Sequence, residues 1–428
     1  MREMRDSGFG YIGQIPQAWS IGKLKQFFEK SNVTNHPDDT VLSLYRDYGV
    51  IPKDSRDDNH NVTSLDTSKY KHVDVGDFVI NKMKGWQGSM ALSPYEGIVS
   101  PAYHVFKFRS SELYPKYAHY LLRCRSFADE WRRLSTGLRV GQWDLHVEDF
   151  LNTCIPHPPL DEQRRIADSL DERCADIDVA VDAASSNLTD YQQLRTAIIS
   201  SAVTRGVDDG NRMVSTSSRW IKSIPDGWSI RQLKSLSTYI SDGVHQTPEY
   251  VLEGVPFISI KDVSSGKIRF DDCKYISWDA HEALSKSTPV GDGDVLFTRI
   301  GTLGKSVVVR KCPPFDIFVS LGIVKPKKEI IVPEYLSYVM QSSYYMEYIQ
   351  HVKVDGKNSA AKYNLGDVRK SPIILPPMDE QMQIVKYLDY RLRALEQLLS
   401  TKQSIIADLK AYKQSLVYEV VTGKREVR

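Results

Sequence analysis

The chain has 428 residues, of which 41% are hydrophobic and 26% charged, and its formal net charge at pH 7 is +2. This length exceeds one ordinary hydrophobic core, so two or more domains are expected, and the composition excludes a disordered chain. The near-neutral charge neither requires nor excludes a nucleic-acid partner, and any basic surface must be local.

The residue pattern also disfavours a membrane-spanning protein and a secreted one. No apolar run reaches the roughly 18 residues of a membrane span, and the first residues lack the apolar stretch of a signal peptide, so a cytoplasmic location is the default expectation. The 5 cysteines form no Cys-x-x-Cys pair, and the 10 histidines form no His-x-x-x-His pair on a helix. The sequence therefore predicts neither a disulfide framework nor a metal site.

The chain repeats itself, starting near its N-terminus. The pattern Ile-Pro-x-x-Trp-Ser-Ile-x-x-Leu-Lys occupies residues 15–25 and returns at 224–234. A match of this length is too long for chance. We expect Trp19 and Trp228 to anchor the start of each domain as packed aromatic side chains.

A second echo pairs residues 76–85 with residues 293–302. Each copy reads as a turn, a buried strand and then a polar loop that contains glycine. The remaining predicted elements are strands at 255–260 and 317–324 and helices near 113–133 and 333–350. Each repeat is therefore expected to contain a mixed α+β domain of about 150 residues.

A third echo closes each repeat. Pro-Pro-Leu-Asp-Glu-Gln at 158–163 and Pro-Pro-Met-Asp-Glu-Gln at 376–381 each open a long run with apolar residues every three or four positions. That period is typical of a helix with one apolar face, and a run of about 43 residues would rise roughly 65 Å. Because both runs must bury an apolar face, we expect them to pair as an antiparallel coiled coil.

The predicted fold class is thus α+β: two similar mixed α/β domains separated by two long helices that form an antiparallel coiled coil with internal pseudo-two-fold symmetry. The expected boundaries are a first domain at 1–157, a first spacer helix at 158–205, a linker at 206–220, a second domain at 221–375, and a second spacer helix with the C-terminal tail at 376–428. Two diverged modules on a rigid spacer suit a DNA target with two different half-sites. A two-headed protein scaffold would fit this geometry as well.

These motifs, with two further segments at 137–145 and 242–250, carry a family resemblance. In their order along nearly the whole chain they resemble the specificity subunit of type I restriction-modification systems. The segment 242–250 (Asp-Gly-Val-His-Gln-Thr-Pro-Glu-Tyr) has no recognisable counterpart in the first half. The two domains are therefore expected to read different sequences.

The resemblance implies a non-catalytic, sequence-specific DNA-binding subunit. Each domain would be a target-recognition domain that reads one half of a bipartite asymmetric site on double-stranded DNA, and the helices would fix the spacer. Two methyltransferase subunits would dock on the helices and methylate adenine N6 with S-adenosylmethionine, and restriction/translocase subunits using ATP and Mg would join them. This chain itself would bind no cofactor. A specificity subunit of a related methyltransferase-nuclease system is an alternative, as is a coiled-coil scaffold without sequence-specific DNA binding.

DNA contacts require cations for phosphates and Arg, Lys, Asn or Gln for base edges. The candidate DNA-binding residues are Lys82, Lys84, Gln87, Arg139 and Gln142 in the first domain, and His245, Gln246, Lys261, Arg299, Lys305, Lys357 and Lys362 in the second. Lys82 and Arg299 occupy equivalent places in the repeat, which favours both. Trp86 and Trp143 are expected to stack or wedge against bases, or to pack within the domain. His245 has a loop-stabilising role as its alternative.

The acidic helix starts have two interpretations. Glu162, Gln163, Glu380 and Gln381 are candidate partner-binding residues, and the alternative is an acidic first turn stabilised by the helix dipole. The segment 161–164 superficially resembles a helicase box, but the chain has no nucleotide-binding Gly-x-x-x-x-Gly-Lys-Ser/Thr loop. The segment 312–315 (Cys-Pro-Pro-Phe) is the nearest match to an amino-methyltransferase loop, and its thiol is a weak acceptor. No catalytic residue is predicted, and a self-sufficient methyltransferase or nuclease is the disfavoured rival.

Overall fold

The computed structural model describes residues 2–46, 48–56, 63–64, 66–137, 143–208, 210–263, 267–356 and 359–427. The chain divides into two units. Unit 1 contains Met1–Ser185 and Ser404–Arg428, and unit 2 contains Ser186–Gln403. Two long helices, α4 (Leu160–Arg205) and α10 (Met378–Val421), each contribute a segment to both units.

Unit 1 contains the first mixed α/β domain. Its strands are β1 (Met4–Asp6), β2 (Gln14–Pro16), β3 (Ser20–Lys23), β4 (Phe28–Ser31), β5 (Leu42–Tyr45), β6 (Gly49–Pro52), β7 (Lys71–Val73), β8 (Phe78–Asn81), β9 (Met90–Leu92), β10 (Gly97–Val99), β11 (Tyr103–Phe108) and β12 (Cys154–His157). Its helices are α1 (Pro115–Arg123), α2 (Arg125–Leu134) and α3 (Val147–Asn152), with 3-10 turns η1 (Leu24–Gln26), η2 (Lys53–Ser55) and η3 (Gly85–Gln87).

Unit 2 contains the second domain. Its strands are β13 (Met213–Ser215), β14 (Ser223–Pro225), β15 (Ser229–Gln232), β16 (Ser237–Asp242), β17 (Val255–Ile258), β18 (Lys274–Ile276), β19 (Val295–Thr298), β20 (Ser306–Val308), β21 (Asp316–Ile317), β22 (Leu321–Pro326), β23 (Val354–Gly356), β24 (Ser359–Lys362) and β25 (Pro372–Leu375). Its helices are α5 (Ile260–Val263), α6 (Trp278–Ser285), α7 (Pro333–Met340), α8 (Ser343–Val352) and α9 (Leu365–Lys370), with the 3-10 turn η4 (Leu233–Ser235).

The two domains that repeat in the sequence also share the same strand topology. Unit 1 has a four-stranded antiparallel sheet in the order β4-β11-β8-β9, and unit 2 has one in the order β16-β22-β19-β20. The short pair β3–β12 in unit 1 likewise corresponds to β15–β25 in unit 2. Both domains are mixed α/β structures on one plan, which confirms the predicted fold class.

One interior strand of each four-stranded sheet, β8 in unit 1 and β19 in unit 2, is buried on both faces. In β8, Phe78 and Ile80 belong to the main apolar cluster of unit 1, and Val79 belongs to a smaller one. In β19, Leu296 faces a smaller cluster while its two neighbours face the main cluster of unit 2. Side chains alternate across a strand, so a continuous apolar run is stable only between two apolar layers.

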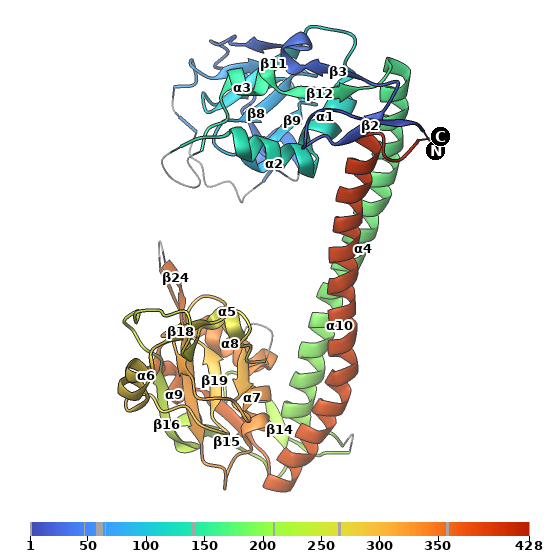
Figure 1. Ribbon diagram of the computed structural model, residues 1–428. Helices are drawn as coiled ribbons and strands as arrows, with labels where there is room; N and C mark the ends of the chain where they lie inside the picture. Colours follow the sequence, from blue (N-terminus) through green and yellow to red (C-terminus); the bar gives the residue numbers. More distant parts are fainter. Residues whose placement is uncertain are drawn as a thin grey trace. The chain divides into compact units, whose positions relative to one another are not determined.

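Within each unit a segment of α4 packs beside a segment of α10 (Figure 1). The buried apolar side chains that the two helices contribute to the main apolar cluster of unit 1 are Ile166, Leu170, Ile177, Leu416, Val420 and Val421. In unit 2 they are Ile199, Ala202, Val203, Ile384, Leu388, Leu392 and Leu395. The first turns of α4 thus meet the last turns of α10, and the last turns of α4 meet the first of α10, so the helices are antiparallel.

Two segments differ in detail from the sequence expectation. The helical stretch near 113–133 is broken at Cys124, whose extended backbone (φ −67°, ψ 157°) ends α1 and starts α2. The segment expected to be a linker includes β13, which pairs with β14 and so belongs to the second domain. In the described part of the chain, no helix is both long and apolar enough to cross a membrane.

Candidate nucleic-acid interface

The start of α4 is bonded to the first domain by the residues proposed for partner contact. The indole Nε1 of Trp19 donates to Glu162 Oε2 at 3.2 Å. Gln163 is fully buried; its Oε1 accepts from the backbone N–H of Tyr114 at 2.7 Å, and its Nε2 donates to the carbonyl of Pro158 at 2.8 Å. This amide therefore satisfies backbone groups at the helix start.

The start of α10 repeats this arrangement. Trp228 Nε1 donates to Glu380 Oε2 at 2.9 Å. Gln381 is 1% exposed; its Oε1 accepts from the N–H of Val332 at 2.9 Å, and its Nε2 donates to the carbonyl of Pro376 at 3.0 Å. In both copies the glutamine is buried. Of the four candidate partner-binding residues, only Glu162 and Glu380 are therefore partly exposed at the surface.

In the first domain three of the candidate DNA-binding residues, Lys82, Lys84 and Gln87, lie on the turn between β8 and β9. Asn81 Oδ1 accepts the backbone N–H groups of Met83 and Lys84 at 3.1 and 3.2 Å, which shapes the turn. Gly88 closes it in the left-handed conformation (φ 79°). Lys84 and Gln87 are exposed, so a charged and an amide side chain both reach solvent from one short turn.

Lysines near the start of β11 form a basic cluster, of which the sequence predicted only Lys82 as a DNA-binding residue. Lys71 Nζ donates to the carbonyl of Tyr103 at 2.6 Å, beside half-buried Lys82. Burial, together with the positive charges of Lys82 and Lys30, lowers the pKa of Lys71 to about 8. Burial and the charges of the same lysines lower the pKa of His104 to about 3. A phosphate group would relieve this concentration of positive charge.

Two tryptophans lie at the edge of the turn. The rings of Trp86 and Trp143 are 5.4 Å apart between centroids and inclined by 59°, and Trp86 Nε1 donates to the carbonyl of Met83 at 3.0 Å. They pack against each other while remaining partly exposed. Arg139 and Gln142 lie outside the described residues.

In the second domain Arg299 is held inside a polar network. It is 8% exposed, and its Nη1 donates to Asp242 Oδ2. His245 Nε2 lies 3.1 Å from the same carboxylate oxygen, although the His245 side chain is 70% exposed. The positive charge at this position of the repeat is therefore neutralised by Asp242. Lys82, its counterpart in the first domain, instead lies among other cations.

The loop between β19 and β20 is fastened to its surroundings at both ends. Gly301 N–H donates to the carbonyl of Ala361 on β24 at 3.0 Å. Gly304 has a φ of 85°, a backbone conformation that favours glycine, and it lies against the Met346 side chain of α8, where a Cβ would be 1.9 Å from Sδ. Lys305 follows directly and is partly exposed.

The remaining described candidates of the second domain lie on the 242–250 segment, on β24 and on α5. Gln246 and Lys362 are exposed, on the 242–250 segment and on β24. Lys261 is also exposed, but its Nζ donates to the carbonyl of Asp272 and lies 3.8 Å from Asp262 Oδ1. Lys357 lies outside the described residues. The structure thus brings Arg299 and His245 together, while Lys261 interacts with acidic and carbonyl groups of a neighbouring loop.

The same strand order in both domains, with different polar loops on each copy, defines a two-domain protein built on an internal repeat. The family model for the type I restriction modification DNA specificity domain matches residues 16–178 and 225–405. Since these two segments cover most of the chain, it belongs to the family of type I restriction-modification DNA specificity proteins. This family confers DNA sequence specificity, as the resemblance in the sequence predicted.

Curated relatives agree with this assignment. The chain is 22% identical to the putative type I restriction enzyme MjaX specificity subunit of Methanocaldococcus jannaschii, over 97% of this chain and 96% of that protein. It is 20% identical to the type I restriction enzyme EcoKI specificity subunit of Escherichia coli K12, over 96% and 90%. The match to the EcoBI specificity subunit of Escherichia coli is 22% identical and spans 65% of this chain and 60% of that protein.

A solved structure supports the fold. A chain from a study of complex assembly and conformational transition of the type I R-M system aligns with a TM-score of 0.64 at 18% identity. The alignment covers 96% of this chain and 99% of that chain. At this identity the likeness concerns the fold alone.

Proposed function

We propose that this chain reads a bipartite, asymmetric site on double-stranded DNA, with one half-site assigned to each domain. The observation that carries this proposal is that the two domains share one strand order but carry different polar loops. The sheets β4-β11-β8-β9 and β16-β22-β19-β20 share one strand order. The Lys82 turn presents clustered cations, whereas the equivalent Arg299 loop is tied to Asp242. Different polar surfaces on the same frame suit two different half-sites.

In each domain, charged side chains and amide side chains would make different contacts with DNA. Lys71, Lys82 and Lys84 are suited to phosphates because ammonium groups neutralise backbone charge without reading sequence. Gln87 and Gln246 carry the donor and acceptor pair that recognises an adenine edge in the major groove. His245, fixed by Asp242, completes a polar surface in the second domain.

The chain acts by directing other subunits rather than by its own catalysis. Two methyltransferase subunits would dock on the paired helices and transfer a methyl group from S-adenosylmethionine to adenine N6. Restriction/translocase subunits would supply the ATP- and Mg-dependent steps. Support for this assembly comes from membership of the specificity family and from two long helices that offer a repeated surface.

The test separates recognition from catalysis. Purified chain, alone and with its methyltransferase partner, is incubated with duplex DNA and labelled S-adenosylmethionine. We expect methylation only when the partner is present, and sequence-dependent mobility shifts of the complex. Methyl transfer by the chain alone would contradict a non-catalytic role, and mobility shifts without sequence preference would contradict half-site reading.

A further inference from the structure

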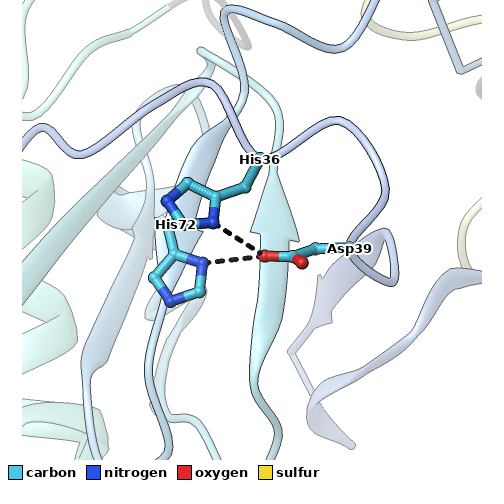
Figure 2. Close-up of side chains that lie close together, drawn as sticks. All are labelled: His36, Asp39 and His72. Carbon is cyan, nitrogen blue, oxygen red and sulfur yellow. Dashed lines mark hydrogen bonds and ion pairs between the residues drawn. The ribbon is translucent and has the colours of Figure 1, made fainter.

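Three side chains of the first domain converge outside the basic cluster. His36 and Asp39 come from the segment that leads into β5, and His72 comes from β7 (Figure 2). Asp39 Oδ2 lies 3.4 Å from His36 Nδ1 and 2.9 Å from His72 Nδ1. The two imidazole rings are stacked at 4.3 Å with an interplanar angle of 29°. Both Nδ1 atoms lie near the same carboxylate oxygen.

The spacing matches the ligand set of a small divalent metal ion. Ligand atoms placed about 2.0–2.1 Å from zinc in a tetrahedron lie about 3.3 Å from one another. The two nitrogen–oxygen distances at Asp39 bracket that value, and the three ligand atoms all lie within 4.8 Å of one another. Two imidazoles and one carboxylate form a common zinc ligand set, with a fourth position for water.

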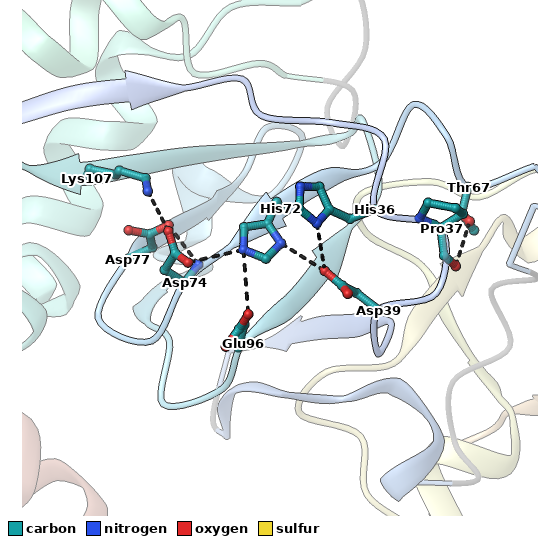
Figure 3. A network of polar contacts seen from close by, with 9 residues as sticks. All are labelled: His36, Pro37, Asp39, Thr67, His72, Asp74, Asp77, Glu96 and Lys107. Atoms are coloured by element: carbon teal, nitrogen blue, oxygen red, sulfur yellow. Dashed lines mark hydrogen bonds and ion pairs between the residues drawn. The ribbon is translucent and has the colours of Figure 1, made fainter.

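Outer carboxylates orient the central histidine (Figure 3). Asp74 Oδ1 lies 3.1 Å from His72 Nε2. Asp74 is itself held by an ion pair with Lys107, and its backbone N–H donates to Asp77 Oδ2 at 3.0 Å. A carboxylate that accepts the Nε2 proton leaves the Nδ1 lone pair free for a metal, and this arrangement is typical of zinc-binding histidines.

The cluster is reachable and joins separate parts of the chain. The exposed side-chain fractions are 41% for His36, 32% for Asp39 and 11% for His72, which leaves a path for an ion from solvent. The backbone already pairs here, since His72 N–H donates to the carbonyl of Val33 at 2.8 Å. A metal ion would add a cross-link between the segment before β5 and the middle of β7.

We infer that His36, Asp39 and His72 form a binding site for a divalent transition metal, with zinc as the favoured ion and Asp74 as the positioning residue for His72. The ion would fix β7, whose first residue, Lys71, contributes to the basic cluster. Neighbouring side chains on a strand point to opposite faces, so the ion would support the basic cluster without contacting DNA.

Direct binding measurements on the full chain test the site. The chain is stripped with a chelator, dialysed, and titrated with Zn²⁺ by calorimetry, and with Co²⁺ while visible absorption is recorded. We expect one equivalent of each ion and a tetrahedral Co²⁺ spectrum. His36→Asn, Asp39→Asn and His72→Asn should each weaken zinc binding more than tenfold, and Asp74→Asn should weaken it about 10–100-fold.

Two variants serve as matched controls. His351→Asn removes an exposed histidine of unit 2, and Glu96→Gln alters a carboxylate 4.0 Å from His72 Nε2. Both should bind zinc as the unaltered chain does. The inference would be overturned if the unaltered chain did not bind zinc. It would also be overturned if the His36→Asn and Asp39→Asn variants bound zinc as tightly as the unaltered chain does. Loss with Glu96→Gln but not with His36→Asn would likewise overturn it, because the ligand set would then be a different one.

Discussion

Trp228 donates its indole N–H to Oε2 of Glu380 across 2.9 Å, and this bond joins the start of the second domain to the first turn of α10. The same bond joins Trp19 to Glu162 at 3.2 Å in unit 1. In each copy the neighbouring glutamine, Gln163 or Gln381, is enclosed beneath it. The repeated motif is therefore a fastening between a recognition domain and its helix.

Truncating the enclosed glutamine should destabilise the second domain. Gln381→Ala leaves the N–H of Val332 and the carbonyl groups of Ile330 and Pro376 without this side-chain partner, so we expect a loss of about 2–4 kcal/mol in the free energy of unfolding. Gln383→Ala is the matched control, because Gln383 is exposed two residues further along the same helix. Urea denaturation measures both, and equal losses would contradict the fastening role.

The equivalent positions Lys82 and Arg299 should respond differently to substitution. Arg299→Met leaves the Asp242 carboxylate, with an exposed side-chain fraction of 12%, without its arginine partner, and we expect a loss of about 3 kcal/mol in stability. Lys82→Met should leave stability nearly unchanged. It should weaken DNA binding and reduce the slope of log K against log salt by about 1. The reverse pattern, with Lys82→Met destabilising and Arg299→Met neutral, would contradict the placement of the two charges.

DNA binding should depend on pH through Lys71. Its pKa is lowered to about 8 in the free protein, and a bound phosphate favours the charged form and raises that pKa. Binding then takes up a proton above pH 8, so affinity should fall as pH rises from 8 to 9.5, by at most about tenfold per pH unit. Lys71→Arg keeps the charge throughout this range and should flatten the profile. Equal pH profiles for the two proteins would place the titrating group elsewhere.

The helices should set the distance between the two half-sites. We propose to insert seven residues into α4 after Ser185 and seven into α10 after Gln403, where the chain passes between its two units. Each insertion lengthens its helix by roughly 10 Å, or about three base pairs. The spacer in the methylated site should lengthen accordingly with both half-sites unchanged. An unchanged spacer would contradict the role of the helices as a ruler.

The sequence predicted the fold class because the repeat and the helical period are strong local signals. Apolar residues at a three- and four-residue spacing over many turns favour a paired helix. The buried state of Arg299 was not predictable in the same way. The burial of Arg299 depends on Asp242, which belongs to a segment with no counterpart in the first half. Arg299 and Lys82 are therefore equivalent in sequence position but lie in different surroundings.

Two other features required the three-dimensional structure. His36 and His72 lie far apart in sequence and meet only because the chain around Thr34 pairs with Lys71. Lys30 and Lys71 lie on β4 and β7, which are separate in sequence from the Lys82 turn that they join. Spacing rules for metal and DNA sites detect residues on one helix or one loop and not residues brought together by strand pairing.

The central claim is that each domain reads its own half-site, and domain exchange tests it most directly. Residues 213–375, which include β13, would be replaced by the matching segment of a relative with a different specificity, and DNA methylated by the assembled system would be sequenced. The account predicts that one half of the methylated site changes while the other half and the spacer remain. A change in both halves, or in neither, would contradict it.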